Sequence, residues 1–511
     1  MEPNEIIIKE LARHRVKTEE LLAKLKRKTA KQYQVPCPDN LSLLRTYHEM
    51  VKNKRVREAQ FIEKLLITRP VRSLSGIVNV SVLTKEYACP GKCLYCPTEI
   101  GIPKSYVSGE PAVERAKSLR YNPYLQVAKR LAMLQDQGHP TDKVEVRIVG
   151  GTWSYYPKKY QDWFVKKCFD ACNGQSSRDL KTAQKINEKA KHRLVGLSIE
   201  TRPDFINPLE IKRLRKLGVT LVELGVQSIY DDILKINLRD HLAEETIIAT
   251  RLLKDAGFKV LYQIMPNLPG ANLERDEKMF QDLFSDQRFK PDFLKIYPCA
   301  LLRSAPLYRL WKNGQYRPYN EKQLINLIKK IKQLIPYYVR IQRISRDIPA
   351  NLIVAGPAKI SNLRQLLAEN MKKEDWQCRC IRCREVKNVP SKKERIYLFR
   401  QNYQASGNPE IFLTWETKDR KLYSLLRLRI TPARAIIREI HTFGQSLLIS
   451  QKSQYAQHQG LGKKLIKKAE EIAIKEFQAK KIAVIAGVGV RGYFRKAGYR
   501  LADTYMVKNL S

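Results

Sequence analysis

Residues 76–97 read GIVNVSVLTKEYACPGKCLYCP, a β-branched segment that leads directly into three closely spaced cysteines. Residues 76–83 have the composition of a buried strand. Cys89, Cys93 and Cys96 follow with the spacing Cys-x3-Cys-x2-Cys. Three thiolates on one short loop can hold three irons of a cubane [4Fe-4S] cluster and leave the fourth iron without a protein ligand. A structural zinc loop is the alternative, but structural zinc normally has four ligands.

Six further segments of the same β-branched kind follow along the chain, separated by stretches of helical length. They are residues 144–149, 194–199, 220–224, 260–264, 293–297 and 339–344. Strands that alternate with helices predict a parallel sheet, and this series predicts a full or partial β/α barrel. The chemistry of such barrels lies on the loops at the carboxyl ends of the strands, where the cysteine loop falls.

A first strand followed by this cysteine spacing resembles the radical S-adenosylmethionine enzymes. In that family S-adenosylmethionine chelates the open iron, and one electron from the cluster releases a 5′-deoxyadenosyl radical. Gly150 and Gly151 follow the second strand and resemble the family's glycine motif for the methionine end of the cofactor, although a plain turn has the same pattern. Glu200, Arg202 and Gln227 stand at strand ends, which favours cofactor or substrate contacts over surface loops.

A second motif lies near the C-terminus. Gln457, Gly460 and Gly462 form the pattern Q-x-x-G-x-G ahead of a helix expected over residues 461–480, which aims backbone N–H groups at a pyrophosphate. This resembles the coenzyme A site of the GCN5-related N-acetyltransferases, and Lys463 and Lys464 could add phosphate contacts. The surrounding α/β unit is expected to contain strands at residues 435–440, 446–450 and 482–485 and a short helix near residue 493.

A second cysteine triplet, Cys378, Cys380 and Cys383, predicts a metal site, most simply zinc. The fourth ligand is not visible in the pattern, and Cys37, Cys299 or water could serve. The cysteines outside the triplets otherwise have the character of ordinary buried thiols.

The 95 Lys and Arg residues exceed the 51 Asp and Glu residues by 44, which predicts a polyanionic partner. With 25 Tyr and 5 Trp available for stacking on bases, RNA fits better than a membrane. Residues 5–28 are helical in pattern and carry a basic cluster at residues 24–28, for which RNA contact and a solvated helix face are both open. The chain has no apolar run of eighteen residues, and a cytoplasmic location is expected.

Taken together, the motifs resemble the catalytic subunit of Elongator and its stand-alone bacterial and archaeal relatives. The resemblance extends from about residue 70 to the end of the sequence, through LRYNPYLQ, GHPTDKVE, GGTW, ELGVQS, MPNLPG, LKIYP, QHQGLG, GVGVRGYF and AGYRL. That family forms 5-carboxymethyluridine at the wobble position, uridine 34, of tRNA and consumes acetyl-coenzyme A and S-adenosylmethionine.

The resemblance also implies roles for individual residues. It assigns acetyl-coenzyme A contacts to Lys143, Glu439, Ile440, His441, Thr442, Leu461, Gly462 and Lys463. An aromatic pair of the family, often Tyr-Tyr, corresponds here to Tyr493 and Phe494, so Tyr493 is the only phenol of the pair. Lys295 and Tyr297, which end a barrel strand, are further candidates for the reaction chamber.

The expected fold is therefore α/β, and we expect four units. Residues 1–70 form a basic helical segment that binds tRNA, residues 71–370 the radical S-adenosylmethionine barrel, residues 371–395 a zinc-binding connector and residues 396–511 the acetyltransferase-like domain. The leading hypothesis is a tRNA carboxymethyluridine synthase. The alternatives are a protein lysine acetyltransferase with a structural iron-sulfur domain and a catalytically silent tRNA-binding component. A homodimer is left open, and the electron donor is not identified.

Overall fold

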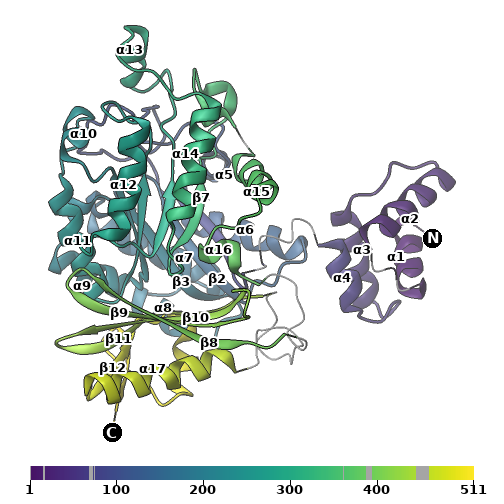
Figure 1. Cartoon of the computed structure of the whole chain (residues 1–511). Helices are drawn as coiled ribbons and strands as arrows, with labels where there is room; N and C mark the ends of the chain where they lie inside the picture. Colours follow the sequence, from purple (N-terminus) through teal and green to yellow (C-terminus); the bar gives the residue numbers. More distant parts are fainter. Residues whose placement is uncertain are drawn as a thin grey trace.

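The computed structural model in Figure 1 describes residues 2–510 except 15, 17, 68–72, 74, 361, 387–393 and 445–459. All seven predicted barrel strands are present. They are β1 Val78–Leu83, β2 Lys143–Val149, β3 Arg193–Thr201, β4 Leu221–Gln227, β5 Lys259–Ile264, β6 Phe293–Ile296 and β7 Arg340–Ile344. Each strand pairs in parallel with the next, and the order β1 to β7 does not close on itself, so the sheet is a partial barrel.

Helices cover the outer face of this sheet (Figure 1). The helices from β1 onward are α5 Pro111–Ser118, α6 Pro123–Asp136, α7 Lys158–Asn173, α8 Leu180–Asn187, α9 Pro208–Leu217, α10 Asp231–Ile236, α11 Ala243–Asp255, α12 Leu273–Ser285, α13 Leu307–Lys312, α14 Glu321–Leu334, α15 Leu363–Lys373 and α16 Ile381–Arg384. Strand residues alternate between the two faces. In β2, Val144, Val146 and Ile148 are buried in the apolar core, whereas Glu145 and Arg147 alternate with them on the inner face.

A second sheet lies across the lower end of the barrel in Figure 1. Its strands are β8 Tyr397–Ala405, β9 Asn408–Glu416, β10 Leu422–Thr431, β11 Arg434–Thr442, β12 Lys481–Val484, β13 Arg500–Ala502 and β14 Tyr505–Asn509, in the order β13-β14-β12-β11-β10-β9-β8. Only β11 and β12 pair in parallel with each other. The predicted helix is α17, Leu461–Phe477, and the short helix near residue 493 is α18, Arg491–Arg495.

The sequence analysis missed five of these strands, β8, β9, β10, β13 and β14. The predicted strand at residues 446–450 lies outside the described residues.

The two sheets meet in a cluster of charges that is buried except for the partly exposed Asp255, and we call it the interdomain ion cluster. Its members are Lys254, Asp255, Asp292, Glu410, Arg427, Arg429, Arg438 and Glu439. Asp292, at the start of β6, accepts hydrogen bonds from Arg438 of β11 at 2.5–3.0 Å, and both side chains are fully buried. Four basic side chains therefore face four acidic ones between the barrel and the second sheet.

Close backbone approach completes this interface. The 3-10 turn η7, Val488–Val490, packs against β3. A Cβ atom on Gly487 would overlap the Val195 carbonyl group, and one on Gly489 would lie 2.7 Å from Arg193 Cβ. The glycines of the GVGV motif are therefore required by packing.

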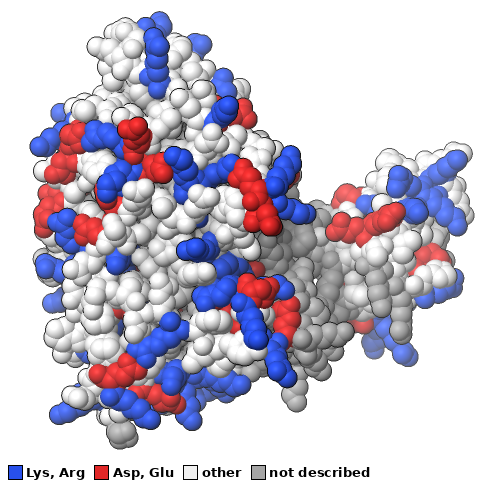
Figure 2. All heavy atoms as spheres, viewed as in Figure 1, with Lys and Arg blue, Asp and Glu red and all other residues white. Residues whose placement is uncertain are grey.

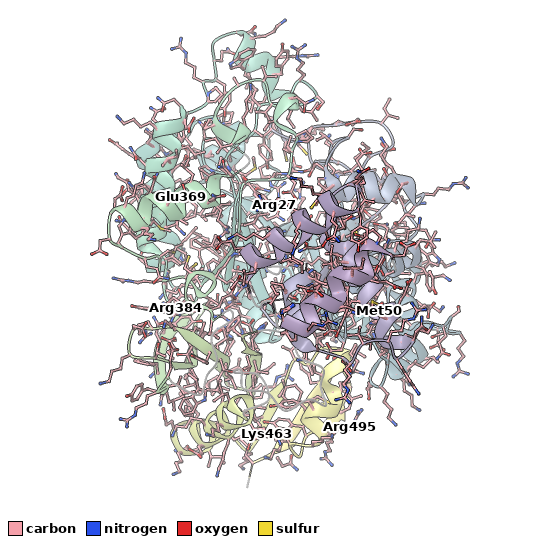
Figure 3. All side chains as sticks on the ribbon, turned by 90° about the vertical axis from the view of Figure 1, so that its right-hand side faces the viewer. Arg27, Met50, Glu369, Arg384, Lys463 and Arg495 are labelled. Atoms are coloured by element: carbon pink, nitrogen blue, oxygen red, sulfur yellow. The ribbon has the colours of Figure 1, made fainter. Side chains whose placement is uncertain are left out.

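The N-terminal residues form a separate helical bundle beside the barrel (Figures 1 and 3). Its helices are α1 Pro3–His14, α2 Glu19–Gln32, α3 Asn40–Lys52 and α4 Gln60–Leu66. The predicted helical stretch 5–28 thus forms two helices, and the Thr18 hydroxyl caps the second by accepting from Leu21 N–H at 3.3 Å. Arg45 of α3 pairs with Asp136 of α6 at 2.8 Å.

Basic and acidic side chains are interspersed on the face seen in Figure 2, so the surplus of 44 positive charges does not form one uninterrupted basic surface there. Among the described helices, none has the length and apolar character needed to cross a bilayer.

Candidate active site

The first cysteine triplet lies where the barrel places its chemistry, on the loop after β1. Cys89, Cys93 and Cys96 line a cavity of about 530 Å³ at the carboxyl ends of the strands, which we call the strand-end cavity. Arg239 donates a hydrogen bond to Cys93 Sγ at 3.4 Å. Burial, together with Cys93 and Cys89, raises the pKa of the Cys96 thiol to about 12. A thiolate at this position therefore requires a bound cation.

The spacing of the sulfur atoms distinguishes the two triplets. The Sγ atoms of Cys378, Cys380 and Cys383 lie within 4.8 Å of one another, as three ligands of one ion must at a Zn–S distance of about 2.3 Å. The first triplet does not meet this limit. Wider spacing fits thiolates that each bind a different iron of one cluster.

Of the glycine pair after β2, Gly151 lines the strand-end cavity, and both residues have positive φ. A Cβ atom on Gly150 would overlap the Thr84 side chain, so this glycine is required by packing. At Gly151 the nearest atom to such a Cβ is 3.8 Å away, and the residue lines the cavity. Only Gly151 therefore offers its backbone to a ligand.

Glu200 and Lys295 occupy the wall of this cavity, and Lys295 also pairs with the buried Glu223. Lys295 Nζ donates to Glu200 Oε1 at 3.1 Å and also to Glu223. Glu200 accepts further hydrogen bonds from Tyr106 at 2.9 Å and Gln263 at 3.1 Å. Burial opposes the ionised form of Glu200, but Lys295 and the Tyr106 hydroxyl outweigh it and the pKa is lowered. Burial raises the pKa of Glu223 despite Lys295, so Glu200 is the carboxylate of the pair that holds its charge.

The other residues predicted at strand ends also line this cavity, with different local roles. Arg202 is 4% exposed and pairs with Asp204 at 2.8 Å and Asp240 at 3.0 Å, which ties its guanidinium down beside the cysteine loop. Gln227 has a φ of +70°, and its Oε1 atom is buried without a hydrogen-bond partner in the described part of the chain. Tyr297 is buried at the cavity wall.

A second cavity, of about 620 Å³, lies between the barrel and the second sheet; we call it the interface cavity. It brings together nearly all the residues that the resemblance assigned to acetyl-coenzyme A. These are Lys143, Glu439, Ile440, His441, Thr442, Gly460, Leu461, Gly462, Lys463, Tyr493 and Phe494. Gln457 lies outside the described residues. Figure 3 places Lys463 and Arg495 in the C-terminal part of the molecule that carries α17 and α18.

The amino end of α17 lines the interface cavity. Gly460 precedes the helix with a φ of +78°, a conformation that favours glycine. A Cβ atom on Gly462 would lie 3.1 Å from the Tyr493 hydroxyl, so this glycine lets the helix approach the phenol closely. Phe494 is 2% exposed and packs edge-on against Tyr499, as a core residue of the second sheet.

Polar groups on β2 and β11 line the same cavity. Glu439 accepts from Arg427 Nε at 2.7 Å, and although burial opposes ionisation, this guanidinium lowers the carboxyl pKa. His441 lies 2.7 Å from the Ser75 carbonyl oxygen, and burial lowers its pKa. Burial also lowers the pKa of Lys143.

The second cysteine triplet lies on and just before α16, between the barrel and the second sheet. Lys332 Nζ is 3.8 Å from Cys383 Sγ. Among the described residues the group of metal-binding side chains includes neither Cys37, which is exposed, nor Cys299, which is buried beside Cys93 in another cluster.

The sequence analysis did not single out several residues of these cavities. Arg147 and Gln342 line both, and Glu145 and Arg239 line one each. The alternation of polar and apolar residues in KVEVRIV was the available signal, since strands buried on both faces are normally apolar throughout.

Comparison with known proteins agrees with this arrangement. The family model of the radical SAM superfamily matches residues 87–283, and that of the radical SAM C-terminal domain matches residues 291–373. The tRNA uridine(34) acetyltransferase of Methanocaldococcus infernus is 46% identical, over 90% of this chain and 91% of its own length. The human Elongator complex protein 3 is 38% identical, over 87% of this chain and 86% of its own.

A solved structure supports the same grouping. The archaeal Methanocaldococcus infernus Elp3 with an N-terminal deletion superposes with a TM-score of 0.75 at 43% identity, covering 86% of this chain and all of that chain. A match of this identity and coverage extends well beyond a shared barrel. The chain therefore belongs to the radical SAM family that comprises the tRNA uridine(34) acetyltransferases and Elongator complex protein 3.

Proposed function

We propose that this protein modifies the wobble uridine, position 34, of tRNA by adding a carboxymethyl group to carbon 5, with acetyl-coenzyme A and S-adenosylmethionine as cosubstrates. One observation carries the proposal: the strand-end cavity and the interface cavity lie at opposite ends of one barrel and share Arg147 and Gln342 as wall residues. The identity of the substrate comes from the relatives, which are named for uridine 34 of tRNA.

The residues of the strand-end cavity suit an iron-sulfur cluster with S-adenosylmethionine. Cys89, Cys93 and Cys96 would bind three irons, and Gly151 would offer its backbone to the methionine end of the cofactor. When bound, this pair supplies a one-electron cleavage whose product can take a hydrogen atom from an unactivated methyl group. Glu200 and Lys295 place complementary charges on the wall of the same cavity, where they can orient polar groups of a substrate.

The interface cavity suits acetyl-coenzyme A. The N–H groups at the amino end of α17 favour the pyrophosphate, with Lys463 and Lys464 beside them. Tyr493 supplies the one phenol of the aromatic pair, because Phe494 has no hydroxyl group. Acid-base catalysis alone would not make the acetyl methyl carbon attack a pyrimidine ring. The reaction of a ligand in the interface cavity therefore requires the radical chemistry of the strand-end cavity.

The remaining assignments extend this proposal to the rest of the chain. We assign zinc to Cys378, Cys380 and Cys383, and tRNA binding to the basic helical bundle of residues 1–70. The boundaries at residues 70, 370 and 395, a cytoplasmic location and a homodimer stay predictions.

The decisive experiment is nucleoside analysis of tRNA. Anaerobically reconstituted protein should convert uridine 34 to carboxymethyluridine only when both cosubstrates are present, as read by mass spectrometry of the tRNA digest. Cys93→Ala should abolish S-adenosylmethionine cleavage and uridine modification while tRNA binding is kept. Cys172→Ala, which removes a buried thiol from α7, is the matched control. Unmodified tRNA together with acetylation of lysine peptides would contradict the proposal and favour a lysine acetyltransferase.

A further inference from the structure

The lumen of this barrel is polar along its length. Barrel interiors are ordinarily filled by layers of branched apolar side chains. Here the positions that alternate with the apolar core carry charges and amides instead. Residues that line one or both cavities from these positions include Asn79, Ser81, Glu145, Arg147, Lys295 and Gln342. A polar lumen is costly to keep dry, which indicates that polar ligand groups or water occupy it.

The polar positions connect the two cavities. Asn79 and Glu145 line the interface cavity, and Ser81 lies two residues further along β1, at the strand-end cavity. Arg147 and Gln342 stand between them and line both. Asn79 Oδ1 and Gln342 Oε1 are buried with no hydrogen-bond partner in the described part of the chain, as expected where a ligand or water belongs.

Arg147 is the cation best placed at this junction. Its Nε donates to Glu145 Oε1 at 2.7 Å, and a guanidinium has four further N–H donors. The side chain is 23% exposed, and because it lines both cavities it is reached from each of them. Lys295, the other lumen cation near it, is held between Glu200 and Glu223.

We propose that Arg147 binds the carbonyl oxygen of the acetyl group at the junction of the two cavities, so that the acetyl methyl group faces the strand-end cavity. This rests on the proposed function, which places coenzyme A in the interface cavity. Glu145 is the positioning residue that holds the guanidinium at the junction. A carbonyl oxygen accepts a hydrogen bond from a guanidinium where water is largely excluded. The loss of this hydrogen bond should therefore strongly weaken the binding of a ligand that lacks the carbonyl oxygen.

The test compares two coenzyme A analogues, one with this carbonyl oxygen and one without it. The ketone analogue, in which a methylene group replaces the thioester sulfur, keeps the carbonyl group and is not hydrolysed. S-ethyl-coenzyme A has a chain of similar size without the oxygen. Titration calorimetry on the reconstituted full-length protein, without S-adenosylmethionine or tRNA, should show the ketone binding about 10-fold more tightly or better.

Arg147→Gln should bring the two affinities to within about 2-fold of each other, with S-ethyl-coenzyme A binding unchanged. Arg147→Lys, which keeps the charge and disturbs folding least, should restore part of the preference. Arg178→Gln, a change at a surface arginine 85% exposed, should keep it all. In turnover, Arg147→Gln should still cleave S-adenosylmethionine but lose uridine modification.

The assignment of Arg147 would be overturned if Arg147→Gln kept the full preference for the ketone over S-ethyl-coenzyme A, or if it lost binding of both analogues. The proposed function would stand in either case. Failure of the wild-type protein to bind either analogue would instead overturn the proposed function itself. The two failures are therefore distinguishable.

Discussion

Replacing Asp292 by asparagine removes the negative charge that joins the barrel to the second sheet while keeping the shape of the side chain. Asp292 is fully buried and accepts hydrogen bonds from groups on two strands. These are Val260 N–H of β5 at 2.9 Å and the Arg438 guanidinium of β11 at 2.5–3.0 Å. Burial opposes its ionisation, but Arg438 and Lys254 outweigh that effect and lower its pKa. The carboxylate is therefore charged at neutral pH.

The expected loss of stability follows from the charges left behind. Without Asp292, Arg438, Lys254 and Arg427 keep their positive charges in a buried site with one fewer anion. Removal of one partner from a buried ion pair typically costs about 3 to 5 kcal/mol. Because three cations share Asp292, we expect the upper part of that range, which corresponds to a fall in melting temperature of roughly 4 to 5 °C for a chain of 511 residues.

Differential scanning calorimetry of the full-length protein measures this fall. Asp286→Asn, six residues earlier, removes a carboxylate that pairs with Arg288 at the surface and should cost less than about 1 kcal/mol. The loss of contact between the two sheets should also split the melting profile of Asp292→Asn into separate transitions. Equal melting temperatures for the two variants would refute the view that the interdomain ion cluster holds the sheets together.

Three further outcomes are expected. Burial raises the pKa of Asp276 from 3.8 to about 6, so the folded state holds a proton that the unfolded state has lost. The free energy of unfolding should therefore fall as pH rises from 4 to 6. Denaturation across this window should show the free energy of unfolding of Asp276→Asn rising by up to about 3 kcal/mol relative to that of the wild type. Gly487→Ala should destabilise the protein by overlap with β3, whereas Gly492→Ala, with no atom within 4 Å of the added carbon, should not, and equal melting curves would contradict the close packing. Cys380→Ser should lower the zinc content measured by mass spectrometry of the metal, and an unchanged content would place the zinc elsewhere.

The barrel could be predicted from the sequence because each strand is a short β-branched run beside a helix. The seven strands appear within a few residues of their predicted ends. The second sheet was harder, and β10 shows why: its run LLRLRI alternates Leu with Arg427 and Arg429, which suggests an exposed face. Both arginines are instead fully buried and pair with the distant Asp292 and Asp255 of the barrel, which no local pattern reveals.

The candidate site divides in the same way. Cysteine spacing and the glycine turn are local signals, and the residues they indicate do line the two cavities where these residues are described. Arg147 and Glu145 belong to no motif. The position of Arg147 at the junction depends on how the two cavities, each lined by residues from distant parts of the chain, meet inside one barrel. The local sequence does contain a signal for the division of residues 5–28 into two helices. Thr18 followed by two glutamates is typical of a helix N-terminus.

The buried charges between the two sheets bear on which pieces of the chain can stand alone. A fragment ending at residue 395 would expose Asp292 and Lys254 to solvent, and one beginning at residue 396 would expose Arg427 and Arg438 beside apolar strands. The interface cavity would exist in neither, since its walls come from Ser75 through Lys496. A ribosome making this chain completes the barrel first, and the cavity proposed for acetyl-coenzyme A can form only after the residues up to Lys496 have emerged and docked.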